Sequence, residues 1–70
     1  MVPLTVAHTG ESNTIRKIGG NSEIKKHLGE LGFVPGTHVT VITEINGNVI
    51  VNVKESRVAV SREMATKIMI

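Results

Sequence analysis

Residues 37–54, THVTVITEINGNVIVNVK, predict the central hairpin of the protein. Valine, isoleucine and threonine dominate both halves of this stretch. Their β-branched side chains favour strands because they are stiff at χ1 and pack well on a pleated surface. The halves meet at Asn46-Gly47-Asn48, residue types that tolerate the positive φ of a tight turn. We therefore expect an antiparallel pair with strands over 37–45 and 49–54.

The register of this hairpin follows from its alternation of apolar and polar residues. A two-residue loop at Asn46-Gly47 would pair Glu44 with Val49 and mix polar and apolar side chains on each face. A three-residue loop pairs Ile45 with Val49 and keeps the valines of both strands together. The pattern therefore predicts the three-residue loop.

The residues after the hairpin continue the sheet. Glu55-Ser56 is expected to turn the chain, and residues 57–61 alternate as a third strand. Ser61 can cap a single helical turn over 62–65, because its hydroxyl can accept a bond from a free N–H of the first turn. Residues 67–70 are expected to close the domain as a short last strand.

The residues at the start of the chain predict two more strands. Residues 4–7 alternate and suggest a short first strand, and residues 13–18 a second one. Ile15 and Ile18 of the second strand are three positions apart, which breaks a strict period of two. A bulge or bend between them would bring both side chains to one face.

An amphipathic helix is expected between the second strand and the hairpin, over about residues 22–31. Ile24, Leu28 and Leu31 recur at the spacing that forms one apolar stripe on a helix. Gly32 follows directly and suits a left-handed C-terminal cap.

Together these elements predict a single domain over residues 1–70 that is mostly β. It has five or six short strands, the inserted helix and a helical turn before the last strand. Short strands at regular spacing are typical of a small sandwich or barrel. The helical turn just before the final strand favours an SH3-like barrel.

The composition argues against catalysis. The 70 residues include no cysteine and no aspartate. Cys-His and Ser-His-Asp constellations are therefore excluded. No phosphate-binding P-loop and no G-x-G-x-x-G occurs. We expect a binding protein without a catalytic residue or a cofactor.

The composition also bears on location. The formal net charge is +2, no run of 18 apolar residues occurs, and the first residues lack the pattern of a signal peptide. A chain without cysteine fits a reducing compartment. We expect the protein to be cytoplasmic.

Four segments resemble one known family. Residues 28–37, LGELGFVPGT, resemble the L-x-x-L-G-F-x-P-G segment of FeoA-type proteins, the small cytoplasmic components of bacterial ferrous-iron uptake. Residues 15–20, IRKIGG, are similar to the I-x-x-I-x-G that precedes the helix in this family. Residues 39–42 and 58–68 resemble its V-x-V-x strand and its closing segment. The resemblance extends from Leu4 to Ile70.

The resemblance implies an SH3-like barrel and an accessory or regulatory role. The supported or regulated protein would be FeoB, the membrane iron transporter with a cytosolic GTPase domain, and we expect the chain to act on it by docking through protein–protein contact. Two alternatives from other classes remain: a small module that responds to a transition metal, and a nucleic-acid-binding adaptor. The oligomeric state, including a homo-oligomer, stays open.

The best candidate metal ligands are Glu23 and His27. They are four residues apart, which places both on one face of the expected helix. Two ligands fall short of the four to six that a transition metal takes. A solvated pair on the helix is therefore favoured over a metal site.

Basic and apolar residues are the candidates for a partner interface. Arg16, Lys17, Lys25 and Lys26 could form one basic patch around the second strand and the helix. Phe33 follows the helix in a loop, and a place in the core is favoured for it over an exposed one. The candidate interface residues are Lys25, Lys26, Phe33, Pro35, Ile42 and Ile50.

Overall fold

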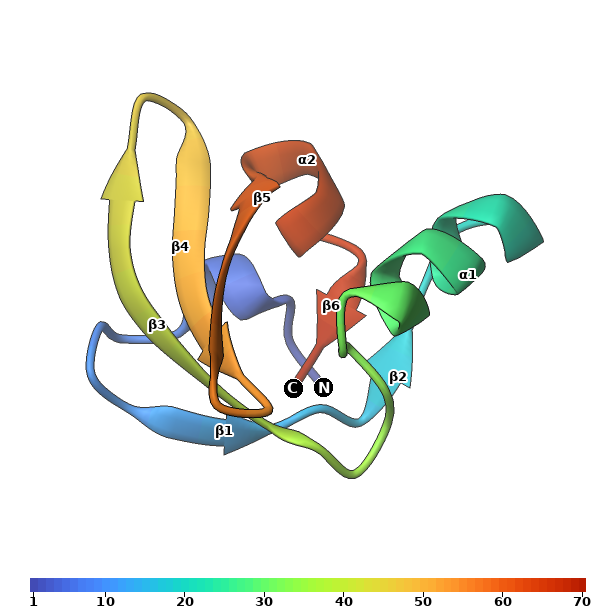
Figure 1. Ribbon diagram of the computed structural model, residues 1–70, viewed down its shortest axis with the longest axis horizontal. Helices are drawn as coiled ribbons and strands as arrows, with labels where there is room; N and C mark the ends of the chain where they lie inside the picture. The colour runs from blue at the N-terminus through green and yellow to red at the C-terminus, as the bar shows by residue number, and fades with distance from the viewer.

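The structure, a computed structural model, describes residues 1–70 and arranges their strands in two antiparallel sheets (Figure 1). The four-stranded sheet has the order β1-β3-β4-β5, and the smaller sheet pairs β2 with β6. The strands are β1 (Ser12–Thr14), β2 (Lys17–Ile18), β3 (His38–Ile45), β4 (Asn48–Val53), β5 (Ser56–Ser61) and β6 (Ile68–Met69). The helices are a 3₁₀ helix (Leu4–Val6), α1 (Ser22–Glu30) and α2 (Arg62–Ala65).

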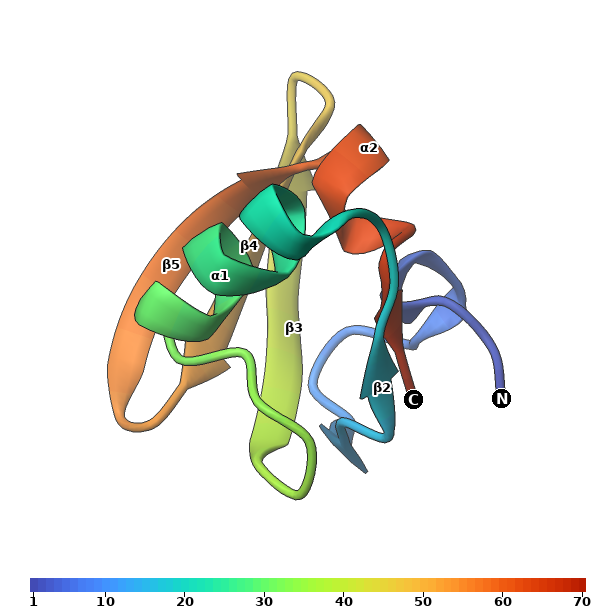
Figure 2. The ribbon, with the colours of Figure 1, turned by 90° about the vertical axis from the view of Figure 1, so that its right-hand side faces the viewer.

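The sheets enclose one aliphatic core. In Figure 1 the large sheet curves around the left of the molecule, α2 closes the top, and α1 lies on the right beyond β6. Figure 2 shows α1 crossing in front of β4 and β5. All thirteen buried residues are apolar: Leu4, Ile15, Ile18, Leu28, Phe33, Val39, Val41, Val49, Val51, Val53, Val60, Ala65 and Ile68. No helix is both long and apolar enough to cross a membrane.

The hairpin forms where it was expected, but the predicted three-residue loop is wrong. Ile45 pairs with Asn48 across a two-residue loop, and Glu44 pairs with Val49. Asn46 and Gly47 have φ of 48° and 81°. Two consecutive positive φ values are typical of a type I′ turn, whose twist matches that of the flanking strands.

A β-bulge removes the mixing of faces that argued against this loop. The register shifts between Val41 and Thr43, so Ile42 is an extra residue in β3. Below the bulge, Val41 pairs with Val51, and the valines of both strands again share the inner face. The predicted pairing of Ile45 with Val49 would have placed Ile45 on the inner face, whereas Ile45 is 54% exposed.

The first strand predicted over residues 4–7 is also wrong. Leu4–Val6 is a 3₁₀ helix, closed by the bond from the Ala7 amide to the Leu4 carbonyl. Leu4 is buried and Val6 points outward. Strand-like pairing occurs before this helix in the chain, where Val2 and Ile70 exchange two backbone hydrogen bonds of 3.1 and 2.8 Å. These bonds and the burial of Leu4 outweigh the local alternation of apolar residues.

The predicted strand over 13–18 is two strands in different sheets. The Ile15 amide donates to the Thr37 carbonyl beside β3, and the next amide, that of Arg16, donates to Met69 in β6. The chain therefore crosses from one sheet to the other at this point. The crossing is the expected bend, and it buries both Ile15 and Ile18.

Helix α1 begins and ends as the sequence predicts. The Asn21 side chain accepts a hydrogen bond of 2.9 Å from the Ile24 amide, which caps the first turn. At the other end the Phe33 amide donates to Leu28 and the Gly32 amide to Gly29, both at 3.0 Å. This bond pair is a Schellman motif, and its two apolar positions, Leu28 and Phe33, both belong to the buried core.

Replacement of Gly32 by alanine is expected to destabilise the protein by about 1–3 kcal/mol, because Gly32 has φ +106° and a side chain there is strained. The nearest atom to an added Cβ, Cγ1 of Val53, is 3.6 Å away, so the cost arises from the backbone and not from a clash. Urea unfolding followed by far-ultraviolet circular dichroism measures it. A neutral result would contradict the strain at this position.

Candidate functional site

A groove opens between α1, β2 and the loop that follows α1. Its volume is about 330 Å³. Strand β2 and the residue before it supply Arg16, Lys17 and Ile18, and α1 supplies Lys25 and Gly29. The loop supplies Phe33, Val34 and Pro35. In Figure 2, α1 lies above the loop that follows it, and β2 lies to the right of both.

The charged residues of this groove all have the same sign. Arg16, Lys17 and Lys25 line it, and no carboxylate does. The single ion pair of the structure joins Arg62 to Glu44 at 2.8 Å, so none of the three cations has a carboxylate partner. They are exposed to solvent. Like charges held together without a counter-charge raise the potential at the groove and favour an anionic ligand.

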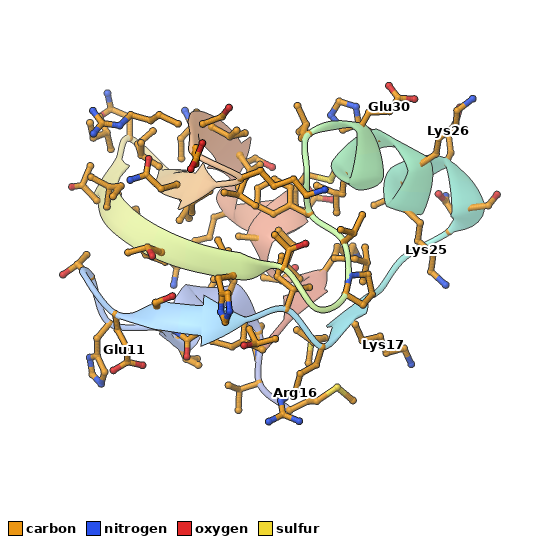
Figure 3. All side chains as sticks on the ribbon, turned by 60° about the horizontal axis from the view of Figure 1, so that its bottom comes forward. Glu11, Arg16, Lys17, Lys25, Lys26 and Glu30 are labelled. Carbon is orange, nitrogen blue, oxygen red and sulfur yellow. The ribbon has the colours of Figure 1, made fainter.

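The expected basic patch is divided by helix α1. Lys25 points down towards the side of Lys17, whereas Lys26 points up beside Glu30 (Figure 3). Arg16 and Lys17 come from the segment at β2, so the fold brings three of the four predicted basic residues to the groove. Lys26, a candidate interface residue, does not line it.

The floor of the groove is apolar. Ile18 and Phe33 are buried core residues that present part of their surface to it, while Val34 is half-buried and Pro35 is exposed. Phe33 is 1% exposed, which confirms its expected place in the core. As a candidate interface residue it supports the groove from below and offers a partner almost no surface.

Gly29 lines the groove from the last turn of α1. A Cβ added at Gly29 would find no atom within 4 Å, so the position adjoins open space. A glycine inside a helix loses more backbone entropy on folding than alanine does. The packing of the core therefore does not require glycine here, and its absent side chain leaves the groove open.

Replacement of Gly29 by alanine is expected to stabilise the protein by about 0.5–1 kcal/mol, since helical alanine loses less entropy and meets no neighbour here. The same unfolding experiment measures it. The changes in the free energy of unfolding caused by Gly29→Ala and Gly32→Ala are expected to have opposite signs. Both residues lie at the same end of the helix, but only Gly32 has a positive φ. A loss of stability in Gly29→Ala would show that the space beside Gly29 is filled.

The remaining interface candidates lie elsewhere. Ile50 alternates with the buried Val49 and Val51, so it points to the outer face of the large sheet. Ile42 is the bulge residue of β3. Both are half-buried, and neither lines the groove. Of the six predicted interface residues, the groove thus unites Lys25, Phe33 and Pro35.

The candidate metal ligands Glu23 and His27 are both exposed on α1. The structure contains no group of three or more His, Cys, Asp and Glu side chains that could hold a metal ion. The pair therefore has no third ligand of these types within this chain.

A second, larger hollow of about 600 Å³ lies between the N-terminal segment and β1. Glu11 and Arg16 bring opposite charges to it, among polar residues such as Ser12 and Thr14. Five of its eleven lining residues are apolar, but it lacks the single sign of charge of the groove at α1. The groove at α1 is therefore the better candidate site.

Comparison with known proteins places these features in a family. The family model FeoA, described as the FeoA domain, matches residues 2–70. The Fe(2+) transport protein A of Methanocaldococcus jannaschii is 36% identical to this chain over 70 residues. The match spans 100% of this chain and 85% of that protein.

Solved structures share the fold. The crystal structure of an iron uptake regulatory protein, FeoA, has a TM-score of 0.88 and 25% identity, and the match covers 96% of this chain and 89% of that one. FeoA of Stenotrophomonas maltophilia, complexed with zinc and described as a procaryotic SH3 domain protein, has a TM-score of 0.84 and 23% identity, with 99% and 88% covered. The expected SH3-like barrel is confirmed.

Proposed function

Because this chain belongs to the FeoA family, we propose that it is an accessory protein of ferrous-iron transport that acts in the cytoplasm by docking on a membrane iron transporter of the FeoB type. The family match over residues 2–70 and the relative named for Fe(2+) transport support the role in iron transport. The observation that supports docking is the groove at α1, where three unpaired cations surround an apolar floor.

Docking would act on the transporter by shifting its conformational populations. A bound protein shifts such an equilibrium only by its difference in affinity for the two states. The accessory protein would therefore bind one state of the transporter's cytosolic part more tightly. An exposed groove on a small rigid barrel suits this role, because little conformational entropy is lost when a preformed surface binds.

The nucleic-acid alternative has less support from the structure. Proteins that bind single strands combine a basic groove with exposed aromatic rings on which bases stack. The only aromatic residue of this chain, Phe33, is buried. The cations of the groove therefore lack the stacking surface that would complete such a site.

Binding to the transporter tests the proposal directly. The labelled protein is titrated with the purified cytosolic GTPase domain of the FeoB-type transporter from the same organism, and with the full-length transporter in detergent micelles. We expect saturable binding to at least one of them, tighter at low salt than at high salt because surface charges are screened. Absence of binding to both at low salt would overturn the proposed function.

A further inference from the structure

We propose that the groove at α1 binds an acidic segment of the transporter, with one apolar side chain seated beside Gly29 and flanking carboxylates facing Arg16, Lys17 and Lys25. This inference rests on the proposed function and names the chemistry of the partner. The segment is part of a protein and not a lipid or a nucleic acid. Its apolar residue and its acidic residues are both required.

The acidic character of the transporter segment is inferred from the three cations that line the groove. Three cations from two separate elements converge on one groove, and no carboxylate of this chain neutralises them. Like charges that line one groove repel each other. A ligand with two or more carboxylates relieves that repulsion and gains charge-assisted hydrogen bonds from the guanidinium and ammonium groups. A basic or neutral segment would gain neither.

The apolar side chain of the proposed ligand is inferred from the apolar residues of the groove and from Gly29. Ile18, Phe33 and Val34 face the groove, and the missing side chain of Gly29 leaves space above them. The volume of about 330 Å³ lies at the lower end of the range for ligand pockets, roughly 300–1,000 Å³. This size suits one side chain of an extended segment and excludes a whole helix. Burial of that side chain supplies affinity that charge alone does not.

The shape of the site distinguishes a protein segment from a bilayer. The cations that line the groove are exposed, whereas Ile18 and Phe33, which line it with them, are buried. A protein that lies on a membrane presents its apolar residues outward, where they enter the bilayer. Here Phe33 and Ile18 are buried in the core and cannot do so. A single side chain that projects from a partner can enter the groove and pack against Val34 and Pro35, the more exposed of its apolar residues.

Short peptides test the chemistry. The probes are the acetylated and amidated peptides Glu-Glu-Leu-Glu-Glu, Glu-Glu-Gly-Glu-Glu and Lys-Lys-Leu-Lys-Lys, titrated into the isotope-labelled full chain by two-dimensional amide NMR. We expect the first to shift the amides of Lys17, Gly29 and Val34. The glycine peptide should bind about fivefold or more weakly, because burial of a leucine side chain contributes 1 kcal/mol or more. Equal binding by the basic peptide would overturn the inference.

Three variants locate the site. Lys25→Glu places a carboxylate on the rim, and Lys26→Glu makes the same charge change at the neighbouring residue outside the groove. Gly29→Leu fills the space beside Gly29 with the side chain of a residue that favours helices. A Cβ added at this position has no atom within 4 Å. We expect Lys25→Glu and Gly29→Leu to weaken binding of the acidic leucine peptide about tenfold, which corresponds to 1.4 kcal/mol. Lys26→Glu should change it less than about twofold, because its charge stands away from the site.

The same variants, titrated with the transporter's cytosolic domain and full-length transporter, separate this inference from the proposed function. If the unmodified protein binds the transporter and Lys25→Glu and Gly29→Leu bind it equally well, docking stands and the groove is the wrong site. If Lys26→Glu loses as much affinity as Lys25→Glu, net charge and not the groove controls binding, and the inference also fails. If the chain binds vesicles of phosphatidylcholine and phosphatidylserine but not the acidic leucine peptide, the ligand is a lipid surface and the inference is overturned.

Discussion

Replacement of Phe33 by alanine is expected to lower the free energy of unfolding by about 3–5 kcal/mol, as for other large aromatic residues removed from a core. Phe33 is 1% exposed and is the largest buried side chain of the domain. A single core below about 70–80 residues supplies roughly 3–5 kcal/mol in total. The loss therefore equals the whole stability of this 70-residue chain, and most molecules should be unfolded at 25 °C.

Circular dichroism is the suitable measurement, because the chain has no tryptophan or tyrosine for fluorescence. The matched control is Val6→Ala, at a position that is 56% exposed, where the change should stay within about 0.5 kcal/mol. A folded Phe33→Ala variant with a loss below about 1 kcal/mol would show that Phe33 does not fill the core.

The second large effect is expected at Leu28, where replacement by alanine should cost about 2–5 kcal/mol. Leu28 is 0% exposed and is the one fully buried residue of α1. Its side chain packs where the Schellman motif folds Phe33 back onto the helix. Loss of this side chain would leave a cavity and weaken the packing of α1 on the barrel. The helix content should therefore fall together with the stability.

Leu31 supplies the control for this prediction, because it belongs to the same apolar stripe but is only half-buried. Leu31→Ala should therefore cost less than Leu28→Ala, since less apolar surface returns to water. Chemical denaturation of both variants under identical conditions gives the comparison. A larger loss at Leu31 than at Leu28 would mean that a different face of α1 packs on the core.

These two core residues also shape the groove. Phe33 forms part of its floor and Leu28 holds α1 in place above it. Loss of binding in either alanine variant would reflect unfolding and carry no information on the partner. Tests of docking therefore belong at Lys25 and Gly29, where the side chain is exposed or absent and the core is untouched.

Helix α1 was predictable because the interactions that define it are close in the sequence. The cap from Asn21 to Ile24 spans three residues, and the bond from Phe33 to Leu28 spans five. The capping turn at Ser61 is equally local, with its hydroxyl accepting from the Met64 amide at 3.1 Å. Residue types alone specify such contacts, since a left-handed C-terminal cap favours glycine wherever the helix lies.

The register of the hairpin was mispredicted because two preferences conflicted. The Asn46-Gly47 turn favours a two-residue loop, whereas the valine pattern favours the register of a three-residue loop. A regular β3 strand can satisfy only one of these two preferences. An extra residue at Ile42 satisfies both, since the bulge leaves the two-residue loop in place and shifts the register of the part of β3 farther from the turn.

The candidate site was predictable only in part. Lys25 and Pro35 were expected at an interface, and Arg16 and Lys17 in a basic patch, because charge and turn residues are visible in the sequence. That Gly29 leaves the groove open was not foreseen, since a glycine in a helical pattern has no local signal of what lies beside it. The tertiary structure alone shows the open space there.

By itself the sequence determined the helix with its C-terminal cap, the strands of the hairpin meander and the family. Each depends on neighbouring residues or on periodicity, which the chain carries wherever it folds. Tertiary structure decided the bulge, the crossing between sheets after Ile15, and the meeting of Lys25 with Arg16 and Lys17 at one groove. The physical reason is that these features depend on contacts between distant segments, whose energies local patterns do not contain.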